Sequence, residues 1–147
     1  MPPPSDDRSR RVTRGEAPPA GADDRRARGR EAEDLAVAFL EERGCEVLAR
    51  NHRIRRGEVD LVCRDGDVVC FVEVRSRTSA AQGGPEETVQ TAKARRVVAA
   101  ATDWAMRNGA LEGAIRFDVV AVTFGDGAPR VEHFRAAFDA SGRPGAW

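Results

Sequence analysis

Three acidic side chains interrupt two apolar segments of the sequence: Glu58 and Asp60 in "GEVDLVC", and Glu73 in "VVCFVEV". Carboxylates are unusual in such segments, because burying a charge is costly unless the charge is paired. Side chains alternate along a strand, so Asp60, Glu73 and Arg75 point to one face if the two segments form a hairpin. Two carboxylates on neighbouring strands can hold one cation between them, and oxygen-only ligands suit Mg²⁺ or Mn²⁺.

The hairpin register depends on its turn, for which the Asp-Gly pair at 65–66 is the predicted centre. With that centre, Glu58 is expected directly opposite Glu73, and Asp60 diagonal to Glu73 with Cβ atoms about 7–8 Å apart or less. Like charges directly opposite each other destabilise a sheet, so Arg75 or a divalent metal must neutralise them. The residues alone leave two interpretations open: a metal site, and a set of solvated salt bridges.

Two predicted helices and three further strands must position this hairpin. Helical spacing of apolar residues predicts helices over 29–44 and 85–109, and strand patterns cover 45–51, 114–124 and 130–138. The order α-β-β-β-α-β-β predicts an α/β domain with a mixed sheet flanked by helices. We expect a disordered N-terminal tail over 1–25, the domain over 26–138, and a loose C-terminal tail over 139–147.

Composition narrows the class of protein. Acidic and basic residues balance at 24 each, so net charge indicates no polyanionic partner. Cys45, Cys63 and Cys70 form no C-x-x-C pair, and buried free thiols are the interpretation we favour. No apolar run has the length of a membrane span, and the N-terminus lacks the apolar core of a signal peptide. A cytoplasmic location away from membranes is therefore expected.

The run "GREAEDLAVAFLEERGCEVLARNHRIRRGEVDLVCRDGDVVCFVEVRSR", with "KARR" and "RFDVVAV" downstream, resembles the YraN-type proteins of the UPF0102 family over residues 27–135. The family hallmark is R-x-x-x-G-E-[IV]-D-L-[IV] followed by F-V-E-V-[KR]-x-R. That family is similar to the PD-(D/E)xK nuclease superfamily and, within it, to archaeal Holliday-junction resolvases. The resemblance implies a restriction-endonuclease-like αβββαβ core and Mg²⁺- or Mn²⁺-dependent hydrolysis of phosphodiester bonds in duplex or branched DNA.

The resemblance also implies roles for single residues. Asp60 matches the first metal-binding acid and Glu73 the acid of E-x-K, with the backbone carbonyl of Val74 completing the metal shell. Glu31, on the first helix, matches an additional acid of the resolvase-like branch. Arg75 stands where Lys is commonest, and Arg is a poor base. Cleavage therefore stays open, with a catalytically weak or inactive nucleic-acid-binding module as the alternative and a protein-interaction scaffold as a third class.

Lys93, the only lysine in the chain, is a candidate to replace the missing lysine. Gln90, Lys93 and Val97 fall on one face of the second helix, and Val97 should pack on the sheet. Lys93 could then point toward the acids near the start of that helix. The plain alternative is a solvated surface charge.

Arginines are expected to supply phosphate contacts to nucleic acid. The candidates are four residues of the connection between the first two strands and one residue after the hairpin: Arg50, Arg53, Arg55, Arg56 and Arg77. Arg95 and Arg96 either join them or form an ordinary solvated helix face. Few aromatic residues and no Tyr argue against stacking on single strands. A homodimer is one open option for the oligomeric state.

Overall fold

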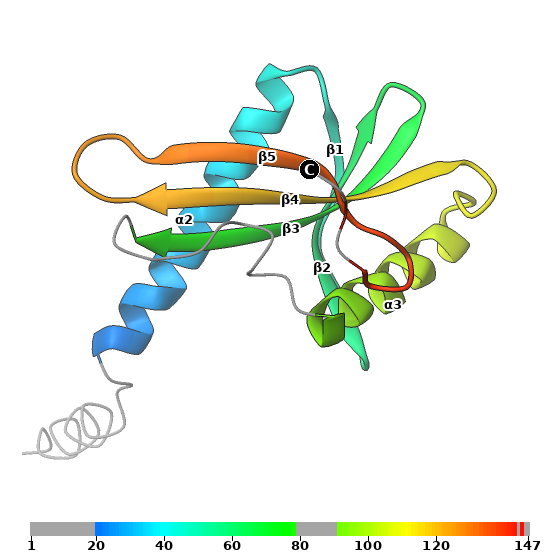
Figure 1. The fold of residues 1–147 in the computed structure, drawn as a ribbon, viewed down its shortest axis with the longest axis horizontal. Helices are drawn as coiled ribbons and strands as arrows, with labels where there is room; N and C mark the ends of the chain where they lie inside the picture. Colours follow the sequence, from blue (N-terminus) through cyan, green and yellow to red (C-terminus); the bar gives the residue numbers. More distant parts are fainter. Residues whose placement is uncertain (1–19, 79–90, 144, 146–147) are drawn as a thin grey trace, which may run out of the picture.

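The computed structural model of the chain describes residues 20–78, 91–143 and 145. In chain order its elements are α2 (Ala20–Glu42), β1 (Glu46–Ile54), β2 (Gly57–Asp65), β3 (Val68–Thr78), α3 (Thr91–Arg107), β4 (Ala114–Phe124) and β5 (Arg130–Phe138) (Figure 1). This order confirms the predicted α-β-β-β-α-β-β arrangement. The bounds of β4 and β5 also coincide with the predicted ones.

The five strands form one mixed sheet in the order β1-β2-β3-β4-β5. Only β3 and β4 are parallel, and every other neighbouring pair is antiparallel. A parallel pair needs a long crossover connection, and α3 lies in the connection between β3 and β4. A mixed sheet of this kind with flanking helices is consistent with the expected restriction-endonuclease-like core.

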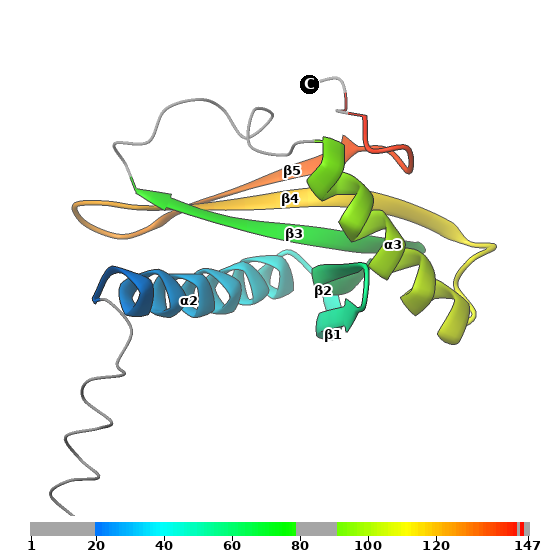
Figure 2. The same cartoon turned by 90° about the horizontal axis from the view of Figure 1, so that it is seen from below.

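The two helices cover opposite faces of the sheet (Figure 2). The buried stripe of α2, with Ala36 and Leu40, packs on residues of β2, β3 and β4. The stripe of α3, with Val97 and Ala101, packs on the other face against Phe71 and its neighbours. Small alanines on both helices let the helix backbones approach the sheet closely. The site described below lies where both helices border the same part of the sheet.

The ends of the domain differ from the expected boundaries. Residues 1–19 of the predicted disordered tail lie outside the described residues, and α2 already begins at Ala20 rather than near residue 29. Ala and Arg are strong helix formers, so the helix extends N-terminally from its packed part. At the other end, residues 139–143 form a turn instead of a loose tail. The backbone N–H of Asp139 donates to the carbonyl of Arg143 at 2.9 Å, and its side chain accepts from the N–H of Ser141 at 2.9 Å.

The turn between β2 and β3 is displaced from its predicted centre. Asp65 pairs with Val68, so the two central residues are at 66–67 rather than 65–66. Gly66 has a φ of 62° and is the first of them, as glycine is in a type II′ hairpin turn. The pairing of Glu58 with Glu73 was therefore wrong. The observed register shifts the pairing partner of each residue by two positions. Every side chain of the hairpin therefore still points to the predicted face of the sheet.

The three cysteines are free and buried, which confirms the sequence-based interpretation. Burial raises the pKa of Cys63 and of Cys70 to about 12, so both remain protonated thiols at neutral pH. Among the described residues, no helix has the length and apolarity needed to span a bilayer.

A buried polar cluster joins β4 to β5 on the face that α2 covers. Asp118 is fully buried, and its carboxylate accepts from Arg116 Nε and Nη2 at 2.9 Å and lies 2.8 Å from His133 Nε2. The backbone N–H of Ala136 donates to the same carboxylate at 3.0 Å. Burial would raise the pKa of Asp118, but the hydrogen bonds from His133 and Arg116 outweigh burial and lower it. This acid is held by a complete set of partners within the fold.

Gly57, at the start of β2, fixes the position of the β1–β2 hairpin against α3. A Cβ atom at this residue would overlap the backbone carbonyl of Arg96. Residue 57 is therefore limited to glycine by contact between two backbones. This contact sets where Glu58 and Asp60, which follow directly on β2, stand relative to α3.

We predict that Gly57→Ala destabilises the protein by about 1–3 kcal/mol, because α3 or the hairpin must shift to admit a methyl group. Urea unfolding monitored by circular dichroism measures the change. Gly29→Ala is the matched control, because Gly29 lies in α2 with open space at its Cβ position. That control should be neutral or stabilising by up to about 1 kcal/mol. Equal stabilities of Gly57→Ala and the wild type would contradict the proposed contact.

Candidate functional site

The site forms where β2 separates from β3. β2 pairs with β1 from Gly57 to Arg64, but it pairs with β3 only from Leu61 to Asp65. Beyond that point β3 continues beside β4 to its end at Thr78. Residues 57–60 and 73–78 therefore border an opening between the strands.

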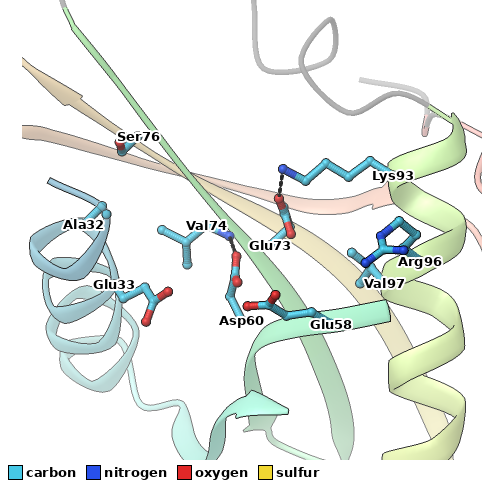
Figure 3. A pocket seen from close by; sticks show the side chains of 11 residues that line it. Ala32, Glu33, Glu58, Asp60, Glu73, Val74, Ser76, Lys93, Arg96 and Val97 are labelled. Atoms are coloured by element: carbon cyan, nitrogen blue, oxygen red, sulfur yellow. Dashed lines mark hydrogen bonds and ion pairs between the residues drawn. The ribbon is translucent and has the colours of Figure 1, made fainter. Parts of the chain in front are cut away.

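Both helices close this opening into a pocket (Figure 3). Four elements line it: Gly29, Ala32 and Glu33 from α2, Glu58 and Asp60 from β2, Glu73, Val74 and Ser76 from β3, and Lys93, Arg96 and Val97 from α3. Its acids come from α2, β2 and β3, and its two basic residues come from α3. The pocket thus has an acidic side and a basic side.

Asp60 and Glu73 are brought together, as the sequence predicts. The last β2–β3 pair on this side is Leu61 with Val72, so Asp60 and Glu73 are the next residue on each strand. The side chain of Glu73 is 6% exposed. One carboxylate oxygen of Asp60 accepts a hydrogen bond from the backbone N–H of Val74 at 2.8 Å. The carboxyl groups of both acids face the same pocket in Figure 3.

Asp60 is in an unfavourable environment for its charge. Burial, followed by the charge of Glu73, raises the pKa of Asp60 to about 8. The hydrogen bond from Val74 opposes this shift, and the charges of Glu33 and Glu58 add to it. At neutral pH the group therefore carries a proton.

Lys93 reaches Glu73 from α3. Its Nζ lies 2.7 Å from Oε2 of Glu73, and its side chain is 49% exposed. This contact directs Lys93 toward the acids, which is one of the two alternatives that the sequence left open, and its catalytic role stays a prediction. Val97, one turn further along α3, is buried against the sheet. Because Lys93 lies on the same face of the helix, this packing orients Lys93 toward the pocket.

The acid that α2 contributes to the pocket is Glu33 rather than Glu31. Glu31 is exposed and does not line the pocket. Gly29, Ala32, Glu33 and Ala36 have the i, i+3, i+4, i+7 spacing of one helical face, and Glu31 falls outside it. The small residues at 29 and 32 were the available signal, because they lie on the face of α2 that lines the pocket.

Arg75 and the predicted phosphate-binding arginines are placed differently from one another. Arg75 is half-buried on β3 and does not line the pocket. Arg50 donates to Asp34 on α2 at 2.9 Å, and Arg53 lies 3.3 Å from Glu58. Two of the candidates are therefore engaged with acids of the domain.

The remaining candidates differ from one another in exposure and in their contacts. Arg55 and Arg56 are exposed in the β1–β2 turn, with no ion-pair partner within the described ranges. Arg77 Nε donates to Thr123 Oγ1 on β4 at 3.4 Å. Arg96 lines the pocket, whereas its neighbour Arg95 is exposed and does not.

The family model described as "Uncharacterised protein family UPF0102" matches residues 32–122, which include the acids of β2 and β3 and all of α3. The chain belongs to the UPF0102 family. It is 75% identical over 125 residues to a UPF0102 protein of Anaeromyxobacter dehalogenans, covering 85% of this chain and 93% of that protein. It is 44% identical over 113 residues to a UPF0102 protein of Rhodococcus jostii, covering 76% of this chain and 96% of that protein.

Further UPF0102 relatives share the same region. A UPF0102 protein of Geobacter metallireducens is 41% identical over 111 residues, covering 76% of this chain and 91% of that protein. The chain therefore spans nearly the whole length of these relatives.

We predict that Asp60→Asn stabilises the protein increasingly as the pH rises. The folded-state pKa of about 8 lies above the ordinary pKa of an aspartate, 3.8, so ionising Asp60 costs folding free energy between these two pH values. The gain of the variant should be small near pH 4 and reach on the order of a few kcal/mol above pH 8. Urea unfolding in EDTA at several pH values measures it.

Asp126→Asn, in the exposed β4–β5 turn, is the control for loss of an acid elsewhere. A stability difference between Asp60→Asn and the wild type that is the same at pH 5 and pH 8.5 would contradict the unfavourable environment of Asp60.

Proposed function

We propose that this UPF0102 protein is a Mg²⁺- or Mn²⁺-dependent hydrolase of phosphodiester bonds in duplex or branched DNA. One observation carries the proposal. Asp60 and Glu73, from two separating strands, face a single pocket in which burial and mutual repulsion raise the pKa of Asp60 to about 8. Strongly perturbed acids in a cleft are typical of functional sites, and a divalent cation would relieve the repulsion.

The donor set fits a hard cation with few protein ligands. No three His, Cys, Asp or Glu side chains of the described residues form a metal cluster by themselves. Mg²⁺ is usually bound through one or two carboxylates, with water and substrate phosphate completing its shell. Asp60 and Glu73 are such a pair, and the carbonyl of Val74 remains the predicted third protein ligand. The absence of His and Cys from the pocket lining argues against Zn²⁺.

Each residue of the site would have a separate role in hydrolysis. When bound, the cation supplies Lewis acidity toward a phosphate oxygen and lets water act as a nucleophile near neutral pH. Val74 orients Asp60 through its N–H, and Lys93 orients Glu73. The ammonium of Lys93, half-exposed at the pocket, is a compact charge able to contact a phosphate. Arg75, which stands where Lys is commonest in the family pattern, does not line the pocket.

The alternative proposal is a nucleic-acid-binding module of the same fold that cleaves weakly or not at all. Arg75 stands at the position where Lys is commonest, and this favours the binding module, because Arg is a poor base. The pocket contains Lys93 instead, which comes from a different element and approaches Glu73 from α3. Wild-type cleavage decides between the two proposals.

The first prediction of the proposed function concerns metal and cleavage together. The wild type should bind Mg²⁺ or Mn²⁺ with release of about one proton at pH 7, because the cation displaces the proton of Asp60. Calorimetry in two buffers of different ionisation enthalpy measures this release. Labelled duplex, flap and four-way-junction DNA should be cut with either metal and remain intact in EDTA.

Asp60→Asn and Glu73→Gln should lose both metal binding and cleavage, whereas the control Asp126→Asn should keep both. Equal heats in the wild type and in Asp60→Asn with Glu73→Gln would refute the metal site. Metal binding by the wild type without cleavage of any substrate would leave the binding-module alternative.

A second prediction concerns the DNA-binding surface. Replacing Arg55 and Arg56 by Ala should weaken DNA binding and reduce its salt dependence by about one unit of slope for each lost phosphate contact. Fluorescence anisotropy at several salt concentrations measures the slope. Arg64 and Arg130 are exposed and pair with acids on their own or a neighbouring strand, so their double Ala variant is a control of equal charge. Equal slopes for the two double variants would exclude the β1–β2 turn from the DNA contact.

A further inference from the structure

The basic side of the pocket consists of two residues on one face of α3. Lys93 and Arg96 are three positions apart and both line the pocket, with the buried Val97 beside them. Figure 3 shows them on the α3 side, across from Glu58 and Glu73. Two cations one helical turn apart repel each other, so an anion between them would be stabilising.

These two cations differ in their present partners. Lys93 lies 2.7 Å from the carboxylate of Glu73, whose side chain is 6% exposed. A carboxylate buried to this extent needs a positive partner, and Lys93 supplies it. Arg96 is exposed and has no ion-pair partner in the part of the chain that the structure describes.

We propose that Lys93 and Arg96 together form a phosphate-binding subsite. Lys93 becomes available to a phosphate when a divalent cation takes the place of its ammonium group at Glu73. The inference rests on the proposed function, because it requires the cation at Asp60 and Glu73. The incoming cation neutralises Glu73 and repels the ammonium group. The half-exposed side chain of Lys93 has a flexible four-carbon stem and can turn toward Arg96. A planar guanidinium and an ammonium together suit the oxygens of a phosphate group.

This exchange links the two ligands of the pocket. A bound cation frees Lys93 for the phosphate, and a bound phosphate holds Lys93 away from Glu73. By thermodynamic reciprocity, each ligand must then increase the affinity for the other by the same factor. The acidic and basic sides would thus take up a divalent cation and a phosphate group as a pair.

Calorimetry with Mg²⁺ and thymidine 5′-monophosphate tests the subsite without requiring cleavage. In the wild type, Mg²⁺ should tighten nucleotide binding by about tenfold relative to EDTA. Arg96→Gln should lose nucleotide affinity and keep Mg²⁺ binding, whereas Arg95→Gln, the exposed neighbour that does not line the pocket, should match the wild type. Lys93→Met should bind Mg²⁺ more tightly than the wild type and lose the coupling to the nucleotide.

The single lysine gives a direct view of the exchange. Reductive methylation with ¹³C-formaldehyde gives one side-chain dimethylamino resonance, from Lys93, which should shift when Mg²⁺ is added to the wild type. In Glu73→Gln the same resonance should already differ before addition and change little afterwards.

Three outcomes would overturn the subsite: nucleotide affinity equal in Mg²⁺ and EDTA, equal effects of Arg96→Gln and Arg95→Gln, or a Lys93 resonance that does not respond to Mg²⁺. If Mg²⁺ binds with any of these results, the subsite is wrong and the metal site of the proposed function stands. If the wild type gives no Mg²⁺ heat at all, the subsite and the proposed function are both wrong.

Discussion

The carboxylate of Glu73 needs a positive partner, and the arrangement of the site follows from this need. Glu73 occupies β3, the middle strand of the sheet, in a position where Val72 and Phe71 precede it in the core. A charge at such a position is tolerated only with a partner of opposite sign. In this protein Lys93 of α3 provides that partner at 2.7 Å. Through this ion pair, α3 contributes an electrostatic contact to this end of the sheet as well as a packing contact.

Two aspartates of the domain, Asp118 and Asp60, show how differently the fold treats a carboxylate. Asp118 is surrounded by Arg116, His133 and the N–H of Ala136, and its pKa is lowered in spite of complete burial. Asp60 has one backbone N–H and several acidic neighbours, and its pKa is raised to about 8. The first joins β4 to β5, and the fold supplies all of its partners. The charge of the second is opposed by its burial and by the neighbouring acids, and we propose that a cation relieves this repulsion.

Much of this arrangement could be predicted from the sequence, because it depends on local patterns. The strands over 114–124 and 130–138, the order of elements and the shared face of Asp60 and Glu73 all follow from alternation and helical spacing. The hairpin register was wrong because an Asp-Gly pair fits a turn in two ways, with glycine as its second or its first central residue. Only the φ of 62° at Gly66 and the pairing of Asp65 with Val68 settle which one applies.

Other parts of the site depend on contacts between distant segments. Helical spacing groups Glu33, rather than Glu31, with Gly29 and Ala32. That this face of α2 borders the opening depends on how α2 packs on the sheet. The pairing of Arg50 with Asp34 likewise requires the position of α2 relative to β1. The contact of Gly57 with the backbone of Arg96 joins residues that are far apart in the sequence, and no local pattern indicates it.

Anomalous diffraction from crystals grown with Mn²⁺ tests the cation site most directly, because it locates the ion independently of catalysis. We expect one strong anomalous peak within coordination distance of the carboxylates of both Asp60 and Glu73, with Nζ of Lys93 moved away from Glu73. A well-ordered pocket without a peak at these two acids, and with Lys93 still bonded to Glu73 in excess Mn²⁺, would contradict the role of this pocket as a metal site.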